Sequence, residues 1–498
     1  MIRFTNLLTF VRGVLVLAAG MVLVFGLALL VDLNLAGQPL SRVFLLDLAD
    51  ARQLNNLLNR SLNQLVAVVF TTVAIAVPLT ANLYSLKFLE FFIKDWVNAA
   101  VLLFVVFTDV ANLGAGLALK ADLIPVILVY LLLGATVLCF ALLFPYLYHV
   151  FRFLHPHTLL TRLEHELADH LHAARRQPGP RRAAAAAALE HIANIGIRSV
   201  ERGDRNTAVE SIASLDRVLR AYWPAKAGLP AAWFLAEQDF FLGFSSAAMD
   251  DLTASRAWVE MKIFGQLHQL IGAAVGRLPE VTRTAAKTLR QLSLEPAARA
   301  DAAVRDLTAE HFNTLLRLAL NRRDARAVFT VFDQYRLYAE AINAEHPEFG
   351  LEIAYYFQYY GQVARDTGQT FLVETAAYDL GALVQAAWAA GAPNRAALLE
   401  RFLHYDDQAR QPLRGVKKAQ AILASHFLMH DLAEPADQIR AHWADLEPAF
   451  IRQVRDELLA VRREKYWEIT ERRRNIDYVP DAQRAQLGRF FETVLGAG

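Results

Sequence analysis

The chain has 498 residues, more than one ordinary domain needs, and it is 55% hydrophobic with a formal net charge of +1. A net charge this close to zero gives no reason to expect nucleic acid as a partner. The single cysteine, Cys139, excludes a disulfide within one chain and any metal site built from several cysteines.

Charged residues are unevenly distributed along the chain. Residues 1–154 contain nine Lys or Arg and seven Asp or Glu, although the whole chain has 51 basic and 50 acidic residues. A long stretch with so few charges is typical of a membrane-embedded segment. The contrast predicts a transmembrane bundle over residues 1–154, with the lipid bilayer as its surroundings, followed by a water-soluble part.

Apolar runs predict about four membrane-spanning helices, at residues 14–31, 64–84, 97–119 and 123–148. Each is long enough to cross a hydrocarbon core of ~30 Å at ~1.5 Å per residue. The first run is longer than the apolar part of a cleaved signal peptide, which favours an anchor helix. The connection 34–63 is rich in leucine, and we expect it either to lie at the membrane interface or to extend the second span.

The distribution of basic residues sets the expected orientation. With four spans, both termini lie on one side, which then carries six Lys or Arg near the membrane against four on the other side. This bias favours a cytoplasmic C-terminal domain, and the lack of disulfides agrees with it.

Polar residues inside the spans are the first functional candidates: Asp109, Asn98 and Asn112. A carboxylate in lipid is costly and commonly faces the bundle interior, an ion path or a proton relay. The simpler interpretation is that the third helix ends near Thr108 and leaves Asp109 at the interface. The sequence favours this interpretation because Asn112 and Gly114 follow closely.

Helix periodicity continues almost throughout the rest of the chain. The fold class is therefore expected to be all-α, with a juxtamembrane helical domain at residues 155–300 and a C-terminal helical-hairpin domain at residues 301–498. Short polar turns between apolar helices recur at 199–208, 319–327 and 364–371. Their spacing is irregular, so we expect an irregular, solenoid-like stack of hairpins rather than a strict repeat.

One helix face offers a possible metal site. His165, Asp169 and His172 lie at i, i+4 and i+7, a spacing that can present three ligands. A solvated helix next to the membrane explains the same spacing more simply, so no metal and no cofactor are expected. The chain has no phosphate-binding loop, dinucleotide fingerprint or nucleophile elbow, and an enzyme is not predicted.

Two segments of the C-terminal part mix aromatic with polar character. The first is a run of aromatic residues on one helix: Tyr355, Tyr356, Phe357, Tyr359 and Tyr360. We expect these residues to pack in the core, with a partner-binding patch as the alternative. The second segment, Arg463–Tyr478, joins charged and aromatic residues and is expected to dock back on the domain or bind a partner.

Two stretches resemble one family of bacterial predicted membrane proteins that is known only as a domain of unknown function. Val66–Asn112 looks like the family's second and third spans with a short basic link between them. The family usually has a proline where this chain reads Tyr84–Leu86, so the link departs from the pattern. Ala193–Leu219 is similar to the family's helix–turn–helix.

The turn in the second stretch carries the most specific part of the likeness. Asp204, Thr207 and Ala208 match the family pattern, whereas Gly203 and Arg205 replace its Asn and Pro. Asp204 is also expected to be a helix N-cap on physical grounds. The resemblance covers about residues 1–290. It implies a bacterial inner-membrane protein and brings no established activity.

These observations leave several hypotheses open. The first is a membrane-anchored scaffold whose large cytoplasmic helical domain binds a protein partner. The second is an oligomeric ion channel or transporter with the helical domain as an assembly or sensor collar. It requires a homo-oligomer, because four helices in one chain are too few to enclose a path. A membrane-bound enzyme or sensor would depend on the His165–His172 face alone.

Overall fold

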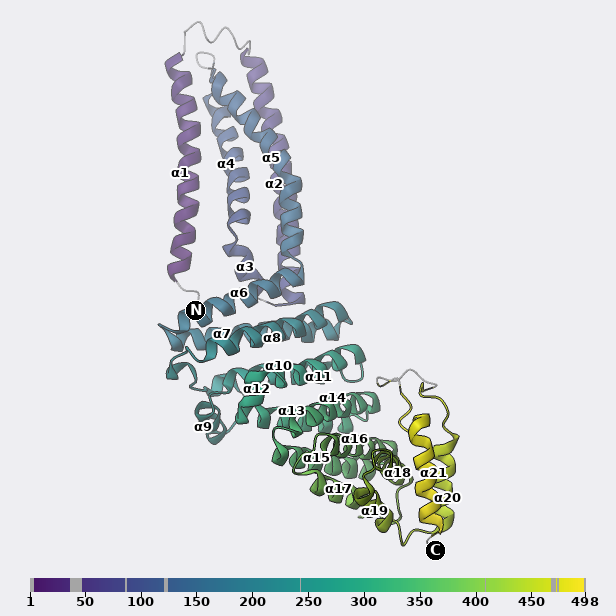
Figure 1. Cartoon of the computed structure of the whole chain (residues 1–498). Coiled ribbons are helices and arrows are strands. Elements are labelled where there is room, and N and C mark those ends of the chain that lie inside the picture. Colours follow the sequence, from purple (N-terminus) through teal and green to yellow (C-terminus); the bar gives the residue numbers. More distant parts are fainter. Residues whose placement is uncertain are drawn as a thin grey trace. The chain divides into compact units, whose positions relative to one another are not determined.

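The computed structural model describes residues 4–35, 47–85, 87–120, 124–241, 243–407, 409–466, 472 and 474–496. These residues form an almost entirely helical chain, which confirms the predicted all-α class (Figure 1). The chain forms two compact units. We call Met1–Arg162 the membrane unit and Leu163–Gly498 the hairpin unit. The expected subdivision of the second unit near residue 300 stays a prediction.

The membrane unit consists of long apolar helices joined by short links. Its helices are α1 (Phe4–Leu35), α2 (Leu48–Leu83), α3 (Lys87–Lys94), α4 (Trp96–Ala118) and α5 (Val126–Phe153). Figure 1 shows α1, α2, α4 and α5 running side by side. Among the described residues, α2, α4 and α5 are long and apolar enough to cross a membrane, and α1 adds a shorter apolar segment, Ala19–Asn34. The count of four spans stays a prediction.

The α2 helix resolves one alternative left open by the sequence. It runs without a break from Leu48 to Leu83, so the described part of the 34–63 connection extends the second span. Its 36 residues correspond to ~54 Å, well beyond a hydrocarbon core of ~30 Å. Ala51, Asn55 and Leu58 are buried on this extension, at the spacing of one helix face.

The short helix α3 packs across the end of the bundle. Its buried residues Phe88 and Phe92 meet Phe153 of α5 edge to face, at ring-centroid distances of 5.3 and 5.5 Å. Asp95 then caps α4, accepting hydrogen bonds from the backbone N–H groups of Val97 and Asn98. The amphipathic link between the second and third spans therefore has a structural role.

The hairpin unit is a succession of shorter helices. They are α6 (Pro156–Ala174, which begins in the membrane unit), α7 (Pro178–Glu201), α8 (Arg205–Lys226), η2 (Ala231–Trp233), η3 (Gln238–Phe240), α9 (Ser246–Ala254), α10 (Trp258–Ala274), α11 (Pro279–Ser293), α12 (Pro296–Ala300), α13 (Ala302–Asn321), α14 (Ala325–Asn343), α15 (Pro347–Asp366), α16 (Thr370–Ala389), α17 (Arg395–Leu403), η4 (His404–Asp406), α18 (Arg414–Met429), α19 (Ala433–His442), α20 (Pro448–Ala460) and α21 (Asp481–Gly496).

Contacts within this unit run from each hairpin to the next. The α7–α8 hairpin packs on α10 and α11, which pack on α13 and α14 (Figure 1). The series continues through α15 and α16 to α18, and α21 closes on α18. Because each pair covers the apolar face of its neighbour, the core is continuous along the stack.

The recurring polar turns share one geometry. Gly203 and Gly368 adopt φ angles of +76° and +75°, and Arg323 occupies the equivalent position with φ +52°. A residue with positive φ ends each preceding helix. The next residue is the N-cap of the following helix. Asp204 and Asp324 cap α8 and α14 in this way with their carboxylates.

The predicted cap at Asp204 is confirmed. Its Oδ1 accepts a hydrogen bond from the backbone N–H of Thr207 at 3.1 Å, and Ala208 is fully buried beneath the turn. The acid thus satisfies a free N–H and the small residue allows close packing, which explains these residue types at the turn.

The C-terminal segment docks on its own unit. Arg472 forms two hydrogen bonds to the carboxylate of Asp379 on α16, at 2.5 and 2.7 Å. Asp477 pairs with Lys418 of α18 at 3.1 Å and accepts a hydrogen bond from Tyr378. For the described residues of Arg463–Tyr478, the prediction that the segment docks back on the domain is therefore confirmed.

Candidate functional site

The predicted intramembrane residues lie on α4. Asn98 and Asn112 are almost fully buried, at 2% and 0% exposure. The side-chain amide of Asn98 donates to the Phe92 carbonyl at 3.3 Å, and that of Asn112 donates to the Thr108 carbonyl at 3.0 Å. Among the described residues, neither side-chain oxygen has a partner. Both amides thus keep an acceptor available inside the bundle.

Asp109 lies inside a continuous helix, so the prediction that this helix ends near Thr108 is wrong. The α4 helix continues to Ala118, through Asn112 and Gly114. In water these residues favour a helix end, but a chain in lipid loses too much by leaving its backbone groups without hydrogen bonds. Asp109 is half-buried, and its Oδ1 has no partner among the described residues.

The neighbouring helices add further polar atoms to this interior. Asn59 on α2 and both Thr136 and Tyr146 on α5 each contain a buried oxygen without a partner in the described part of the chain. A polar atom in an apolar medium without a hydrogen bond costs roughly 1–3 kcal/mol by protein measurements. The interior of the bundle therefore contains several polar atoms that are costly to bury there.

Asp32 is a structurally important residue that the sequence reasoning missed. Its carboxylate, 7% exposed, accepts hydrogen bonds from the backbone N–H groups of Ile127 and Leu128, both at 2.9 Å. It thereby caps α5, whose own N-cap residue, Pro125, forms no side-chain cap. The available signals were an acid directly after the first apolar run and a proline, Pro125, near the start of the fourth run.

Asp95 organises the other end of the bundle and was also missed. Its carboxylate accepts hydrogen bonds from Arg162 at 3.1 Å and contacts His149 Nε2 at 3.1 Å. Burial raises the pKa of Asp95, but the hydrogen bonds from Arg162, the Asn98 backbone and His149 outweigh it and leave the pKa below its usual value. The Arg162 guanidinium also lies 4.0 Å from the centre of the Phe153 ring. This cluster fixes the start of α6 to α4 and α5.

The possible metal face on α6 is not assembled into a site. His165, Asp169 and His172 are all exposed. Their ligand atoms are not close enough together to bind one ion. Among the described residues, another group does bring its ligand atoms that close. The buried histidine of α6 is His170, which contacts Arg181 at 3.2 Å.

That other group consists of Asp406, Asp407 and His442, whose ligand atoms lie within 4.8 Å of one another. Asp406 is already paired with the buried Lys417 at 3.1 Å, and Asp407 contacts His404 at 2.6 Å. A lysine ammonium beside the carboxylate opposes a bound cation. The group is therefore explained by its ion pairs.

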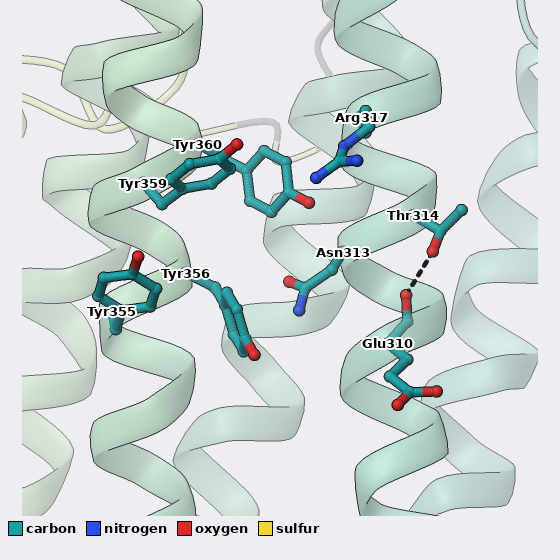
Figure 2. Close-up of a pocket in the computed structure, with 8 residues that line it drawn as sticks. All are labelled: Glu310, Asn313, Thr314, Arg317, Tyr355, Tyr356, Tyr359 and Tyr360. Atoms are coloured by element: carbon teal, nitrogen blue, oxygen red, sulfur yellow. Dashed lines mark hydrogen bonds between the residues drawn. The ribbon is translucent and has the colours of Figure 1, made fainter. Parts of the chain in front are cut away.

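A pocket of about 450 Å³ opens between α13 and α15 (Figure 2). We call it the tyrosine groove, and its lining residues are Glu310, Asn313, Thr314, Arg317, Tyr355, Tyr356, Tyr359 and Tyr360. This volume is within the range of about 300–1,000 Å³ that is typical of ligand pockets.

Helix geometry divides the aromatic run of α15 between core and surface. Phe357 and Tyr360 are buried, at 0% and 3% exposure, whereas Tyr355 and Tyr359 are 49% and 37% exposed. Core packing is thus confirmed for the first pair only. Figure 2 shows Tyr356 and Tyr360 reaching from α15 toward α13. The exposed tyrosines are one helical turn apart and form an exposed stripe within the lining of the groove.

The lower end of the groove in Figure 2 is acidic. Tyr356 donates a hydrogen bond to Glu352 at 3.0 Å, and burial together with this carboxylate raises the pKa of Tyr356 to about 12. Burial also raises the pKa of Glu310, and the carboxylates of Asp306, Asp251 and Glu352 raise it further. Carboxylates from three helices therefore concentrate negative charge at this end.

The upper end of the groove is basic. Arg317 lies two helical turns beyond Glu310 on α13, or ~10 Å along the axis. Burial raises the pKa of Tyr360, and the Arg317 guanidinium opposes part of that shift. The two ends thus differ in charge, with ring faces and the Asn313 amide between them.

The fold defines a membrane protein with several apolar helices at its N-terminal end. Residues 8–194 match the family described as Predicted membrane protein (DUF2254). The match contains the whole of Val66–Asn112 and ends at the beginning of Ala193–Leu219, so the likeness of the Asp204 turn lies beyond it. No curated protein and no solved structure matches the chain.

Proposed function

We propose that this protein is a membrane-anchored binding protein. In this proposal the membrane unit spans a bacterial inner membrane four times, and the hairpin unit lies in the cytoplasm and binds a protein partner. The single observation that carries the proposal is the tyrosine groove with its exposed stripe. Tyrosines are enriched among the residues that dominate binding at protein interfaces.

The surroundings of the groove support recognition rather than core packing. The groove offers ring faces from α15, an amide and a hydroxyl from α13, and opposite charges at its two ends. The helices beneath it are held rigidly, since Phe357 packs edge to face on Phe332 and Tyr335 at 5.8 and 5.3 Å. A preformed surface on rigid helices loses less entropy on binding.

Site-specific photo-crosslinking tests this function. A photoreactive residue replaces Tyr359 in the full-length protein in its native membranes, and the control replaces the similarly exposed Phe371 on α16. We expect a discrete adduct from position 359 alone, and its loss when Thr314→Trp fills the groove. Equal adducts from both positions, or adducts that survive Thr314→Trp, contradict the proposal.

The cytoplasmic location is tested separately. In a Cys139→Ser background, Asp366→Cys places one thiol at an exposed site of α15. A membrane-impermeant thiol reagent should label it in inverted inner-membrane vesicles and leave it unlabelled in intact cells. Labelling in intact cells would contradict the expected orientation.

A second candidate function, an oligomeric channel or transporter, is favoured by the polar interior of the membrane unit. Asp109, Asn112 and Thr136 contain buried oxygens without partners among the described residues. In this case the protein forms a homo-oligomer in detergent and carries ions in reconstituted vesicles. Asp109→Asn should then reduce the flux, whereas Asp47→Asn, at an exposed cap of α2, should not. A monomer without flux excludes this function.

A further inference from the structure

The acidic end of the tyrosine groove contains more negative charge than its surroundings neutralise. Asp251 of α9, Asp306 and Glu310 of α13 and Glu352 of α15 influence one another electrostatically. Among the described residues, none of these four carboxylates forms an ion pair within 4.0 Å, although Arg305 offsets part of the charge on Asp306. All four carboxylates are exposed, and their like charges, gathered at one end of the groove, create a negative potential that attracts a cation.

The walls of the groove also suit a cationic ligand. Tyrosine ring faces attract ammonium and guanidinium groups. The outer side of the stripe already shows this contact, because the Arg401 guanidinium lies 5.7 Å from the centre of the Tyr355 ring. Asn313 adds a buried side-chain oxygen that has no partner among the described residues and lines the same pocket. That oxygen can only accept a hydrogen bond, which a cationic donor supplies.

We propose that the acidic end of the groove holds one lysine or arginine side chain of a basic segment in the partner protein. The cationic group lies against the Tyr356 ring and Glu310, within reach of Asn313. Arg317 at the other end repels a second cation, so one basic side chain enters the pocket. The exposed stripe of Tyr355 and Tyr359 receives the neighbouring residues of the segment. The inference rests on the proposed binding function and names the chemistry of the partner.

The contact area distinguishes a protein segment from a small free cation. A single ammonium ion occupies only part of about 450 Å³ and leaves the two exposed tyrosines uncovered. A peptide segment covers both features, because residues on either side of the basic side chain extend along α15. Charge complementarity and this continuity favour a basic protein segment as the occupant.

The test measures binding of a hexalysine peptide to the full-length protein in a neutral detergent by titration calorimetry. The matched probe is the same peptide with every side-chain amine acetylated, which removes the charge and retains the length. We expect Glu310→Gln to weaken hexalysine binding about tenfold, equivalent to about 1.4 kcal/mol. Tyr356→Leu should weaken it by a similar factor, and Tyr356→Phe by much less, because the ring face rather than the hydroxyl contacts the cation.

The control variant is Asp366→Asn, which removes a carboxylate of α15 that is 71% exposed and lies outside the groove. It should leave the affinity unchanged. Tryptophan fluorescence checks that each variant is folded. Unchanged affinity in both Glu310→Gln and Tyr356→Leu overturns the proposal, as does equal binding of the acetylated peptide. Spermidine that binds as tightly as hexalysine overturns the assignment to a protein segment.

Failures of this inference and of the proposed function are distinguishable. A crosslinked partner at position 359 that persists in Glu310→Gln supports the binding function and overturns the cationic contact. Hexalysine binding that depends on Glu310, in membranes where position 359 yields no adduct, supports the cation site and overturns the proposed partner.

Discussion

The two units bury polar side chains in different ways. In the hairpin unit, buried charges form ion pairs between helices, as Lys417 and Asp406 do with only 4% and 3% of their side chains exposed. In the membrane unit, two carboxylates serve helix ends, where Asp32 caps α5 and Asp95 caps α4. Asp109, in the middle of α4, has an oxygen without a partner among the described residues.

The difference follows from the surroundings of each unit. In lipid every backbone N–H needs an acceptor inside the protein, so an acid is most useful at a helix end. Where the ends of helices can reach water, buried charge pairs instead fix how hairpins meet. Stability effects of substitutions should therefore follow the role of the side chain more than its burial.

Two native probes report on the units separately. Six of the seven tryptophans lie in the hairpin unit, among them the buried Trp233, Trp258 and Trp443. Tryptophan fluorescence therefore follows the unfolding of this unit once Trp96 of the membrane unit is replaced by phenylalanine. Cys139, the single cysteine, is 1% exposed in the membrane unit, so its labelling rate by a thiol reagent follows opening of that bundle.

The largest expected effect comes from breaking the buried pair of the hairpin unit. Lys417→Met leaves the Asp406 carboxylate without its cation and should cost about 3–5 kcal/mol of unfolding free energy. Denaturant titration followed by tryptophan fluorescence measures it. Adding Asp406→Asn should recover part of the loss. The control Arg440→Met breaks an exposed pair with Asp437 and should cost below about 1 kcal/mol. Equal losses in the two single variants would refute this contrast.

The second effect is a pH dependence confined to the hairpin unit. Burial, and then the nearby His268, lowers the pKa of His311 from 6.5 to about 3. The unfolded chain therefore binds a proton that the folded chain excludes, so stability is full above pH 6.5 and falls as the pH drops toward 3. The slope is about 1.4 kcal/mol per pH unit for one proton. His311→Phe should reduce the slope between pH 6 and 4.5, measured by tryptophan fluorescence in denaturant.

The membrane unit should lack this dependence over the same window. The pKa of Asp95 is lowered, so its contribution is present above the ordinary value of 3.8 and is lost only as the pH falls below it. The labelling rate of Cys139 depends on pH through the ionisation of the thiol itself. After correction for this ionisation, the rate should stay constant over the pH range in which tryptophan fluorescence changes. If both probes showed a loss of stability over the same pH range, the pH dependence would not be confined to the hairpin unit.

A smaller effect is expected from the interhelical cap. Asp32→Ala removes the acceptor of two backbone N–H groups at the start of α5 and should cost about 1–2 kcal/mol, which corresponds to roughly 5–30-fold faster labelling of Cys139. The control Asp47→Ala removes the exposed cap of α2, where Asp50 donates at 2.7 Å. That cap contacts water, so its loss should change the labelling rate less. Labelling that is faster in the control than in Asp32→Ala would show that the interhelical cap is unimportant.

The smallest effect is expected at Asp109. Because its Oδ1 has no partner among the described residues, Asp109→Leu removes no hydrogen bond and should not destabilise the membrane unit, so Cys139 should be labelled at the same rate or more slowly. A large acceleration would show that Asp109 supports the bundle, and the contrast with Asp32 would fail.

The sequence by itself determined the features that depend on near neighbours along the chain. Apolar runs placed the long helices, and helix periodicity gave the all-α class. The cap at Asp204 and the similar turn at Asp324 could be read from a few consecutive residues, because a cap bonds to an N–H three positions away. The sequence failed at α4, where lipid keeps a helix intact through residues that end helices in water.

Only the tertiary structure decided the contacts between distant positions. Asp32 caps a helix whose first turn is 95 residues away, and Asp95 meets Arg162 at a separation of 67 residues. The tyrosine groove likewise exists because α13 and α15 lie side by side, which brings Glu310 near Tyr356. Periodicity shows which face of a helix is apolar, but the partner of that face is set by how all the helices pack together.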